Sequence, residues 1–322
     1  MTYWMGKAVK LWLLALAFTL IAGCSDTSRT QLRVGFNLWP GYETLYLAKQ
    51  NGLLNENIKL VELLSATDTM DAFRHGRIEV AALTLDEALL LVTEGISLKI
   101  VLVMDISNGA DAVVVRGSVS ELAQLKGKRV AYEQTAVGAL MLHETLDAAQ
   151  LSMADIDAVH LPANQHFRAF QSRAVDAVVT FEPVTTQLVN QNHKIIFDSA
   201  QIPGKIVDVL VVRTAHLSHY HEALQTLVSA QFSTLEYIEK YPENAAQLMS
   251  PRLGLQPHEL LTALDGITLA DAPTNRSLLV GKGTEPPLHS TVEHLLSVLV
   301  EHNMIDDVAD VQGLVDTRFI LQ

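Results

Sequence analysis

Short apolar runs alternate with amphipathic stretches from Leu32 onward. Each run has the length of a strand. Each stretch between runs has helical spacing and stops at Asn-Gly or at a single glycine, the usual C-cap signals. Strands that alternate with helices of this length predict a parallel α/β sheet. The expected strands are 32–37, 58–63, 78–83 and 98–104, and the expected helices are 42–50, 67–75 and 85–94.

The alternation then restarts, which predicts a second α/β unit. Its expected strands are 112–115, 129–132, 159–161, 175–180 and 195–197, with a helix over 137–149 and a further strand over 207–212. From Ala215 onward the pattern predicts almost only helix, with breaks at Tyr241-Pro242, Ser250-Pro251 and Glu285-Pro286-Pro287.

We interpret the two units as two lobes joined by chain crossings near 108–112 and 204–208. Lobe 1 would comprise 32–110 and 207–322, including the C-terminal helices, and lobe 2 would comprise 111–206. Ligands of open α/β sheets lie beyond the carboxyl ends of the strands. We therefore expect a ligand cleft between the two lobes.

The N-terminus has the layout of an export signal. Lys7 and Lys10 precede an apolar run over 11–21, which is shorter than the roughly 20 residues of a membrane-spanning helix. Small residues and a cysteine follow, so we expect a signal segment over 1–23 and a polar tether over 24–31. The run Leu20-Ile21-Ala22-Gly23-Cys24 resembles a bacterial lipobox, and this resemblance implies that Cys24 becomes the lipidated first residue of the mature protein. The alternative is that Cys24 is an ordinary core residue.

Charge and motifs narrow the function classes. The formal net charge is −13, and loss of 1–23 with its two lysines would make it about −15, which opposes nucleic-acid binding. Cys24 is the only cysteine, so an intramolecular disulfide and a cysteine metal site are excluded. Zinc-protease, serine-hydrolase and phosphate-loop motifs are absent. The spacing of His216, His219 and His221 fits an exposed helix start better than a metal site. We expect a protein without catalytic activity, cofactor or metal.

Several short motifs together resemble one protein family. Trp39-Pro40-Gly41-Tyr42-Glu43, followed by Leu45-Tyr46-Leu47-Ala48, resembles the opening of the nitrate, sulfonate, taurine and thiamine-pyrimidine group of periplasmic binding proteins. Three later matches keep the order and extend the resemblance over about 32–240: Asp71-Ala72-Phe73 with Gly76, Leu125-Lys126-Gly127-Lys128, and Phe181-Glu182-Pro183.

This resemblance implies a two-lobed periplasmic-binding-protein type II fold with a helical C-terminal extension. It also implies a monomer that binds a small molecule and delivers it to an ABC permease with its ATPase. A membrane sensor kinase or cyclase is the alternative partner. Eukaryotic pyrimidine synthases share the fold but use a cysteine-rich motif that this chain lacks.

The candidate ligand residues follow expected strands or lie at the crossings. Aromatic faces at Trp39 and Tyr42 suit a planar or cationic solute. Thr84 with Glu87 forms a capping box, a structural explanation of both, although members of the family bind ligand at this turn. Packing, capping or turn formation is an alternative role for each candidate. The full set is Trp39, Tyr42, Thr84, Asp86, Ser107, Asn108, Glu133, Thr135, Glu182 and Asp208.

The expected charge of the ligand follows from the acids in this set. Sulfonate-binding relatives place serines where this chain has Ala136 and Val137, which disfavours a sulfonate. Glu133, Glu182 and Asp208, together with Asp86 or Asp105, favour an amino-bearing or cationic organic solute. The alternative is a small oxyanion such as nitrate or a sulfonate, held by Trp39, Thr84, Asn108 and the helix N-terminus near Thr135.

Overall fold

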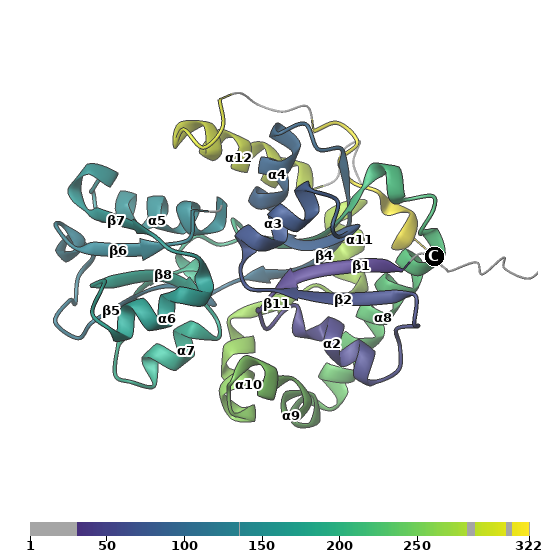
Figure 1. Cartoon of the computed structure of the whole chain (residues 1–322), viewed down its shortest axis with the longest axis horizontal. Coiled ribbons are helices and arrows are strands. Elements are labelled where there is room, and N and C mark those ends of the chain that lie inside the picture. Colours follow the sequence, from purple (N-terminus) through teal and green to yellow (C-terminus); the bar gives the residue numbers. More distant parts are fainter. Residues whose placement is uncertain (1–30, 135, 282–286, 307–310, 322) are drawn as a thin grey trace, which may run out of the picture. The chain divides into compact units, whose positions relative to one another are not determined.

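A computed structural model describes residues 31–134, 136–281, 287–306 and 311–321, and its strands form two sheets (Figure 1). Sheet A has the strand order β11-β4-β10-β3-β1-β2, and sheet B has the order β7-β6-β8-β5-β9. The two sheets with their helices confirm the predicted α/β class and type II fold. The strands are β1 (Leu32–Asn37), β2 (Ile58–Leu63), β3 (Val80–Thr84), β4 (Leu98–Ser107), β5 (Asp111–Val115), β6 (Arg129–Tyr132), β7 (Asp157–His160), β8 (Ala177–Phe181), β9 (Lys194–Asp198), β10 (Val207–Arg213) and β11 (Ile267–Leu269).

Three antiparallel strands correct the expectation of purely parallel sheets: β11, which pairs with β4, β10 and β5. β10 is antiparallel to both β3 and β4, and β5 is antiparallel to both β8 and β9. β10 and β5 are each the first strand after the chain has passed from one sheet to the other. β4 runs toward sheet B, and β5 continues in that direction, away from sheet A. β8 runs toward sheet A, so β5 is antiparallel to it. The carboxyl ends of β3 and β8 therefore meet the first residues of β10 and β5.

Helices pack on both sheets. Their bounds are α2 (Glu43–Gln50), α3 (Ala66–Arg74), α4 (Leu85–Thr93), α5 (Ala136–Ala148), α6 (Ala163–Gln171), α7 (Val184–Val189), α8 (His221–Lys240), α9 (Pro242–Leu253), α10 (Pro257–Asp265), α11 (Ala272–Leu279) and α12 (Leu288–Glu301). α8 and α9 pack against α2, α11 packs against β4, and α12 contacts both α4 and α5. A large buried cluster of Val, Ile, Leu, Phe and Ala side chains fills the space between the helices and the sheets.

The C-terminal part differs from the sequence prediction at two points. Helix α9 continues through Pro251 to Leu253, so Ser250-Pro251 is not a break. Pro251 lies in the last turn, where it removes one backbone hydrogen bond of the helix, and Gly254 in the left-handed conformation ends the helix. The segment 267–269, expected to be helical, forms β11 and pairs with the end of β4.

The structure also bears on membrane and metal binding. In the described part of the chain, no helix has the length and apolar character needed to cross a bilayer. Among the same residues, no group of three or more His, Cys, Asp or Glu side chains is placed to hold a metal ion. The signal segment 1–23, Cys24 and Thr135 lie outside the described residues.

Candidate functional site

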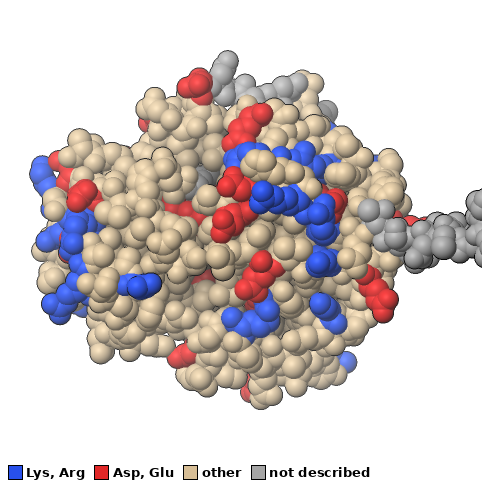
Figure 2. All heavy atoms as spheres, viewed as in Figure 1, with Lys and Arg blue, Asp and Glu red and all other residues tan. Residues whose placement is uncertain are grey.

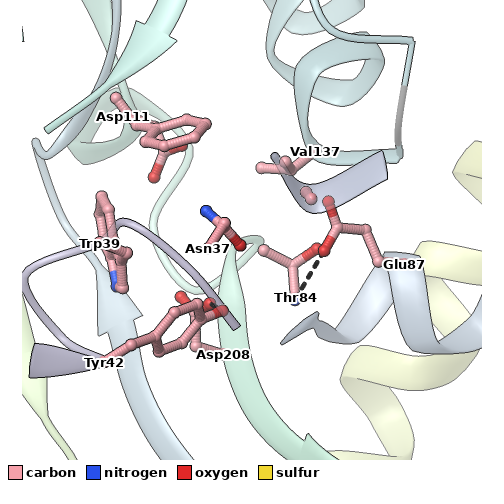
Figure 3. A pocket seen from close by; sticks show the side chains of 10 residues that line it. Asn37, Trp39, Tyr42, Thr84, Glu87, Asp111, Val137 and Asp208 are labelled. Atoms are coloured by element: carbon pink, nitrogen blue, oxygen red, sulfur yellow. Dashed lines mark hydrogen bonds between the residues drawn. The ribbon is translucent and has the colours of Figure 1, made fainter. Parts of the chain in front are cut away.

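A small pocket lies where the carboxyl ends of the strands of the two sheets meet (Figure 3). Its open space is about 20 Å³, enough for a group about as large as one water molecule. Residues of both sheets contribute, from the segments that follow β1 and β3 and from the first residues of β5 and β10. The lining residues are Asn37, Trp39, Tyr42, Ala66, Thr84, Glu87, Asp111, Val137, Phe181 and Asp208.

The turn after β1 carries the two aromatic residues that were predicted. Backbone N–H groups of Tyr42 and Glu43 both donate to the Trp39 carbonyl, at 3.0 and 3.2 Å, and this closes the turn. A Cβ at Gly41 would lie 2.0 Å from Asp105 Oδ2 and 2.6 Å from Trp39 Nε1, so only glycine fits there. The Trp39 ring also meets Phe181 of sheet B edge to face, with centroids 5.9 Å apart.

Below these aromatic rings lies a pair of buried carboxyl groups. Asp105 and Asp208 are register partners on β4 and β10. The Trp39 indole N–H donates to Asp105 Oδ1 at 3.2 Å, and the Tyr42 hydroxyl donates to Asp208. Burial raises the pKa of Asp105 to about 7. This effect outweighs the hydrogen bonds from Asp208 and Trp39, which lower the pKa. Burial and the charge of Asp105 raise the pKa of Asp208 well above its usual range.

The junction of β3 and α4 contains polar atoms with incomplete hydrogen bonding. Glu87 Oε2 accepts a hydrogen bond from the Thr84 N–H at 3.1 Å (Figure 3), as predicted for a capping residue. Among the described residues, Thr84 Oγ1, Glu87 Oε1 and both carboxyl oxygens of Asp86 lack a hydrogen bond of good geometry, although the Thr84 side chain lies in a capping box and close to both acids. Leaving such a buried group unsatisfied costs about 1–3 kcal/mol. Thr84 and Glu87 line the pocket, so a ligand with N–H or O–H donors could satisfy these two.

Burial also perturbs the acids of this junction. Desolvation, together with the charges of Asp86 and Glu133, raises the pKa of Glu87 to about 8. Desolvation likewise raises the pKa of Asp86 to about 6. Asp86 is fully buried but does not line the pocket. Its place in the first turn of α4 suits the helix dipole.

The first crossing between the sheets places Asp111 in the pocket. The Asp111 N–H donates to Ser107 Oγ at 3.3 Å, and Ser107 Oγ lies 2.8 Å from Ser199 Oγ. The Ser107 side chain thus bonds within the crossing and does not line the pocket. Burial raises the pKa of Asp111 to about 7, and the nearby acids add to the shift.

Three other candidates lie outside the pocket. Glu133 accepts from the Thr67 N–H and hydroxyl, at 3.0 and 2.6 Å, and from the Ala163 N–H at 3.2 Å. It therefore joins the first turn of α3, beside sheet A, to the first turn of α6, beside sheet B. Glu182 accepts from the N–H and hydroxyl of Thr186 and so caps its own helix, α7. Asn108 is exposed, and its N–H donates to the Gly266 carbonyl at 2.8 Å.

The structure thus brings together Trp39, Tyr42, Thr84 and Asp208 from the predicted set. It adds Asn37, Ala66, Glu87, Asp111, Val137 and Phe181. Phe181 was noted only as part of a family motif, and Glu87 only as a cap. Asp111 was not among the predicted ligand residues, although its position directly after a crossing was the signal that could have identified it.

Basic side chains do not line the pocket. Figure 2 shows Lys and Arg both at the end of sheet B that lies farthest from sheet A and over the part of the molecule that contains sheet A. Arg129 at the start of β6 belongs to this end, where it pairs with Asp176 at 2.9 Å. Among the described lining residues of the pocket there are three acids and neither Lys nor Arg. The pocket is therefore a site of negative or protonated carboxyl groups without a protein counter-charge.

Solved structures share this fold at low sequence identity. The alkanesulfonate-binding protein SsuA of Xanthomonas axonopodis pv. citri, bound to MOPS, is 18% identical with a TM-score of 0.74, over 89% of this chain and 98% of that one. The aliphatic sulphonate-binding protein SsuA of Escherichia coli is 18% identical with a TM-score of 0.68, over 89% and 92%. The desulfurization enzyme DSZB is 15% identical with a TM-score of 0.65, over 89% and 97%.

Sequence comparison identifies the family. No curated protein matches the chain by sequence. Residues 25–251 match the NMT1-like family, which is more than half of the chain. Together with the structural likeness, this match confirms the resemblance to periplasmic binding proteins that the sequence motifs indicated. The chain belongs to the NMT1-like family.

Proposed function

We propose that this protein is the solute-binding component of an ABC importer and that it binds an amino-bearing, cationic organic solute. The observation that carries the proposal is the pocket with three buried acids, Glu87, Asp111 and Asp208, and no Lys or Arg among its described lining residues. A buried cation must recover its lost hydration from paired charges and hydrogen bonds. This pocket offers both, together with aromatic rings that favour cations.

Binding in place of catalysis is supported by the residues that line the pocket. Among those described, none is Cys, Ser or His, the side chains that most often act as nucleophile or general base. The fold itself does not separate the two functions, since a desulfurization enzyme shares it. The carboxyl, hydroxyl and aromatic groups of the pocket fit recognition of a solute.

A small oxyanion is the second candidate, and a specific observation favours it. The pKa values of about 8 for Glu87 and about 7 for Asp111 keep a fraction of these groups protonated near neutral pH. A protonated carboxyl donates a hydrogen bond and could hold a sulfonate or nitrate, ligands of the structurally similar proteins. The two candidates predict opposite pH dependence: affinity for a cation increases as these acids lose their protons, and affinity for an anion decreases.

The proposed location is the periplasmic side of a bacterial membrane, with a lipid on Cys24 as the anchor. The support is the lipobox-like sequence before Cys24 and the family match that begins at residue 25. Cys24→Ser should release the protein from the membrane fraction. Unchanged membrane association of this variant would contradict the anchor. The proposed partners are an ABC permease and its ATPase, with a membrane sensor protein as the alternative.

The ligand class is tested by calorimetry on the purified protein at pH 6, 7 and 8.5. The panel contains alkylamines, guanidines, aminopyrimidines, alkanesulfonates and nitrate. We expect micromolar or tighter binding of at least one amine, with affinity that increases with pH. Binding of alkanesulfonates or nitrate alone, weakened at high pH, would support the oxyanion candidate instead.

A further inference from the structure

A second cavity, here called the outer groove, adjoins the pocket. Its walls come from the end of β2 and from α6 and α7, and include Leu63, Leu64, Phe167 and Val184. The pocket and the outer groove share two lining residues, Asn37 and Phe181, so they are direct neighbours. The open space of the groove is about 280 Å³, against about 20 Å³ for the pocket.

The pocket limits the size of the charged group. Its space fits one water-sized group, which describes a primary ammonium, whereas a guanidinium or a pyrimidine ring is several times larger. An ammonium group also has three N–H donors. Three lining residues provide acceptors for them: Thr84 Oγ1 and Glu87 Oε1, which lack a hydrogen bond of good geometry, and the Asp111 carboxylate. Thr84 and Glu87 are only 7% and 2% exposed. Because solvent hardly reaches these two side chains, hydrogen bonds from water do not readily take the place of those from a ligand.

The outer groove is mainly apolar, with Asn37, Asn164 and Gln187 as its neutral polar residues, and it carries no unpaired charge among its described lining residues. Leu64 is 69% exposed, more than any other large hydrophobic side chain in the described part of the chain. The charged residue in the groove wall is Glu62, and it forms an ion pair with Arg252. A substituent in this groove would therefore gain by burying apolar surface, and a second charged group on the solute would find no partner there.

We propose that the solute is a primary amine with an apolar chain, whose ammonium group occupies the pocket and whose chain lies in the outer groove. This inference rests on the proposed function and extends it to a ligand class. It assigns charge recognition to Asp111, Thr84 and Glu87. It assigns selection for the apolar chain to Leu64, Phe167 and their neighbours.

The test is a calorimetric series of n-alkylamines, from ethylamine to octylamine, at pH 8. We expect affinity to increase about fourfold for each methylene that the groove buries and to level off once the groove is filled. An alkylguanidine of equal chain length should bind at least tenfold more weakly, because its head exceeds the pocket. Alkanesulfonates of equal length provide the comparison with opposite charge.

Two variants separate the groove from the pocket. Leu64→Gln should reduce the gain per methylene and leave the shortest amines unaffected, whereas Leu53→Gln, at an exposed leucine outside the groove, should behave as wild type. Asp111→Asn should weaken all amines by one common factor and preserve the gain per methylene. Amine binding that does not depend on chain length would overturn the inference and leave the proposed function standing. Absence of binding for amines of every length would overturn the inference, and absence of binding for guanidines and aminopyrimidines as well would overturn the proposed cationic ligand.

Discussion

Replacing Asp111 with asparagine should stabilise the ligand-free protein while it weakens binding. Asp111 is buried and has a pKa of about 7, against 3.8 for an ordinary aspartate. Because the folded-state pKa is raised, the folded protein binds the proton more tightly than the unfolded chain does. The contribution of Asp111 to the free energy of unfolding is therefore fully present below about pH 4 and is lost as the pH rises to about 7. Each pKa unit corresponds to about 1.4 kcal/mol, so the ionised side chain costs on the order of 4 kcal/mol at pH 8.

The asparagine side chain would keep the shape of a carboxyl group and never ionise. Urea unfolding of the Asp111→Asn variant at pH 8 should give a free energy of unfolding higher than wild type by up to about 4 kcal/mol. At pH 4 the two proteins should have nearly equal stability, because wild-type Asp111 is then protonated. Calorimetry with hexylamine at pH 8 should show affinity lower by about 30-fold or more, since one partner of a buried charge pair is gone.

Asp176→Asn is the matched control. Asp176 forms an ion pair with Arg129 far from the pocket, and hydrogen bonds from Arg129 lower its pKa. This variant should lose stability at pH 8, by no more than about 1 kcal/mol for a partly exposed pair, and keep wild-type affinity. Our reasoning would be refuted if Asp111→Asn were less stable than wild type at pH 8, or if it bound the amine equally well.

Three further predictions concern side chains around the pocket. Glu133→Gln should weaken ligand binding about tenfold without a comparable loss of stability, because it breaks a link between α3 and α6. Glu182→Gln alters only a helix cap and should leave the calorimetric affinity unchanged. Equal effects of the two variants on affinity would contradict these roles. Gly41→Ala should abolish binding, because its Cβ would overlap the Asp105 carboxylate; wild-type affinity would disprove this. Burial lowers the pKa of His166 to about 4, so its contribution to stability should fall by about 3 kcal/mol as the pH drops from 6.5 to 4, and His166→Gln should lack this component in urea unfolding.

Most strands were predictable because their signal is local. β1 was predicted with its observed bounds, since a run of apolar residues between polar segments is itself the property that a buried strand needs. β11 escaped prediction because three residues, Ile267 to Leu269, are too few for a period to show. Pro251 was misinterpreted because its effect depends on its distance from the end of the helix, which Gly254 determines.

The pocket was only partly predictable, because it depends on which strands become neighbours. Trp39 and Thr84 were identified since each directly follows a strand that ends at the cleft. Asp105 and Asp208 face each other only because β10 inserts between β3 and β4, an arrangement that no local pattern encodes. Glu133 and Glu182 have the same charge and similar positions after strands, yet one links two helices and the other caps its own helix.

The location of Asp105 and Asp208 matters for anyone who wishes to redesign this protein as a sensor. The two residues lie on β4 and β10, the strands through which the chain passes between the sheets. A mutation that changes their charge therefore alters the segments that must bend in any hinge motion, so new selectivity and an altered response amplitude would arise together. Leu64 and Phe167 lie on neither strand. Libraries that vary the outer groove first and retain the carboxyl pair would diversify the recognised chain while the mechanical response of the scaffold stays constant.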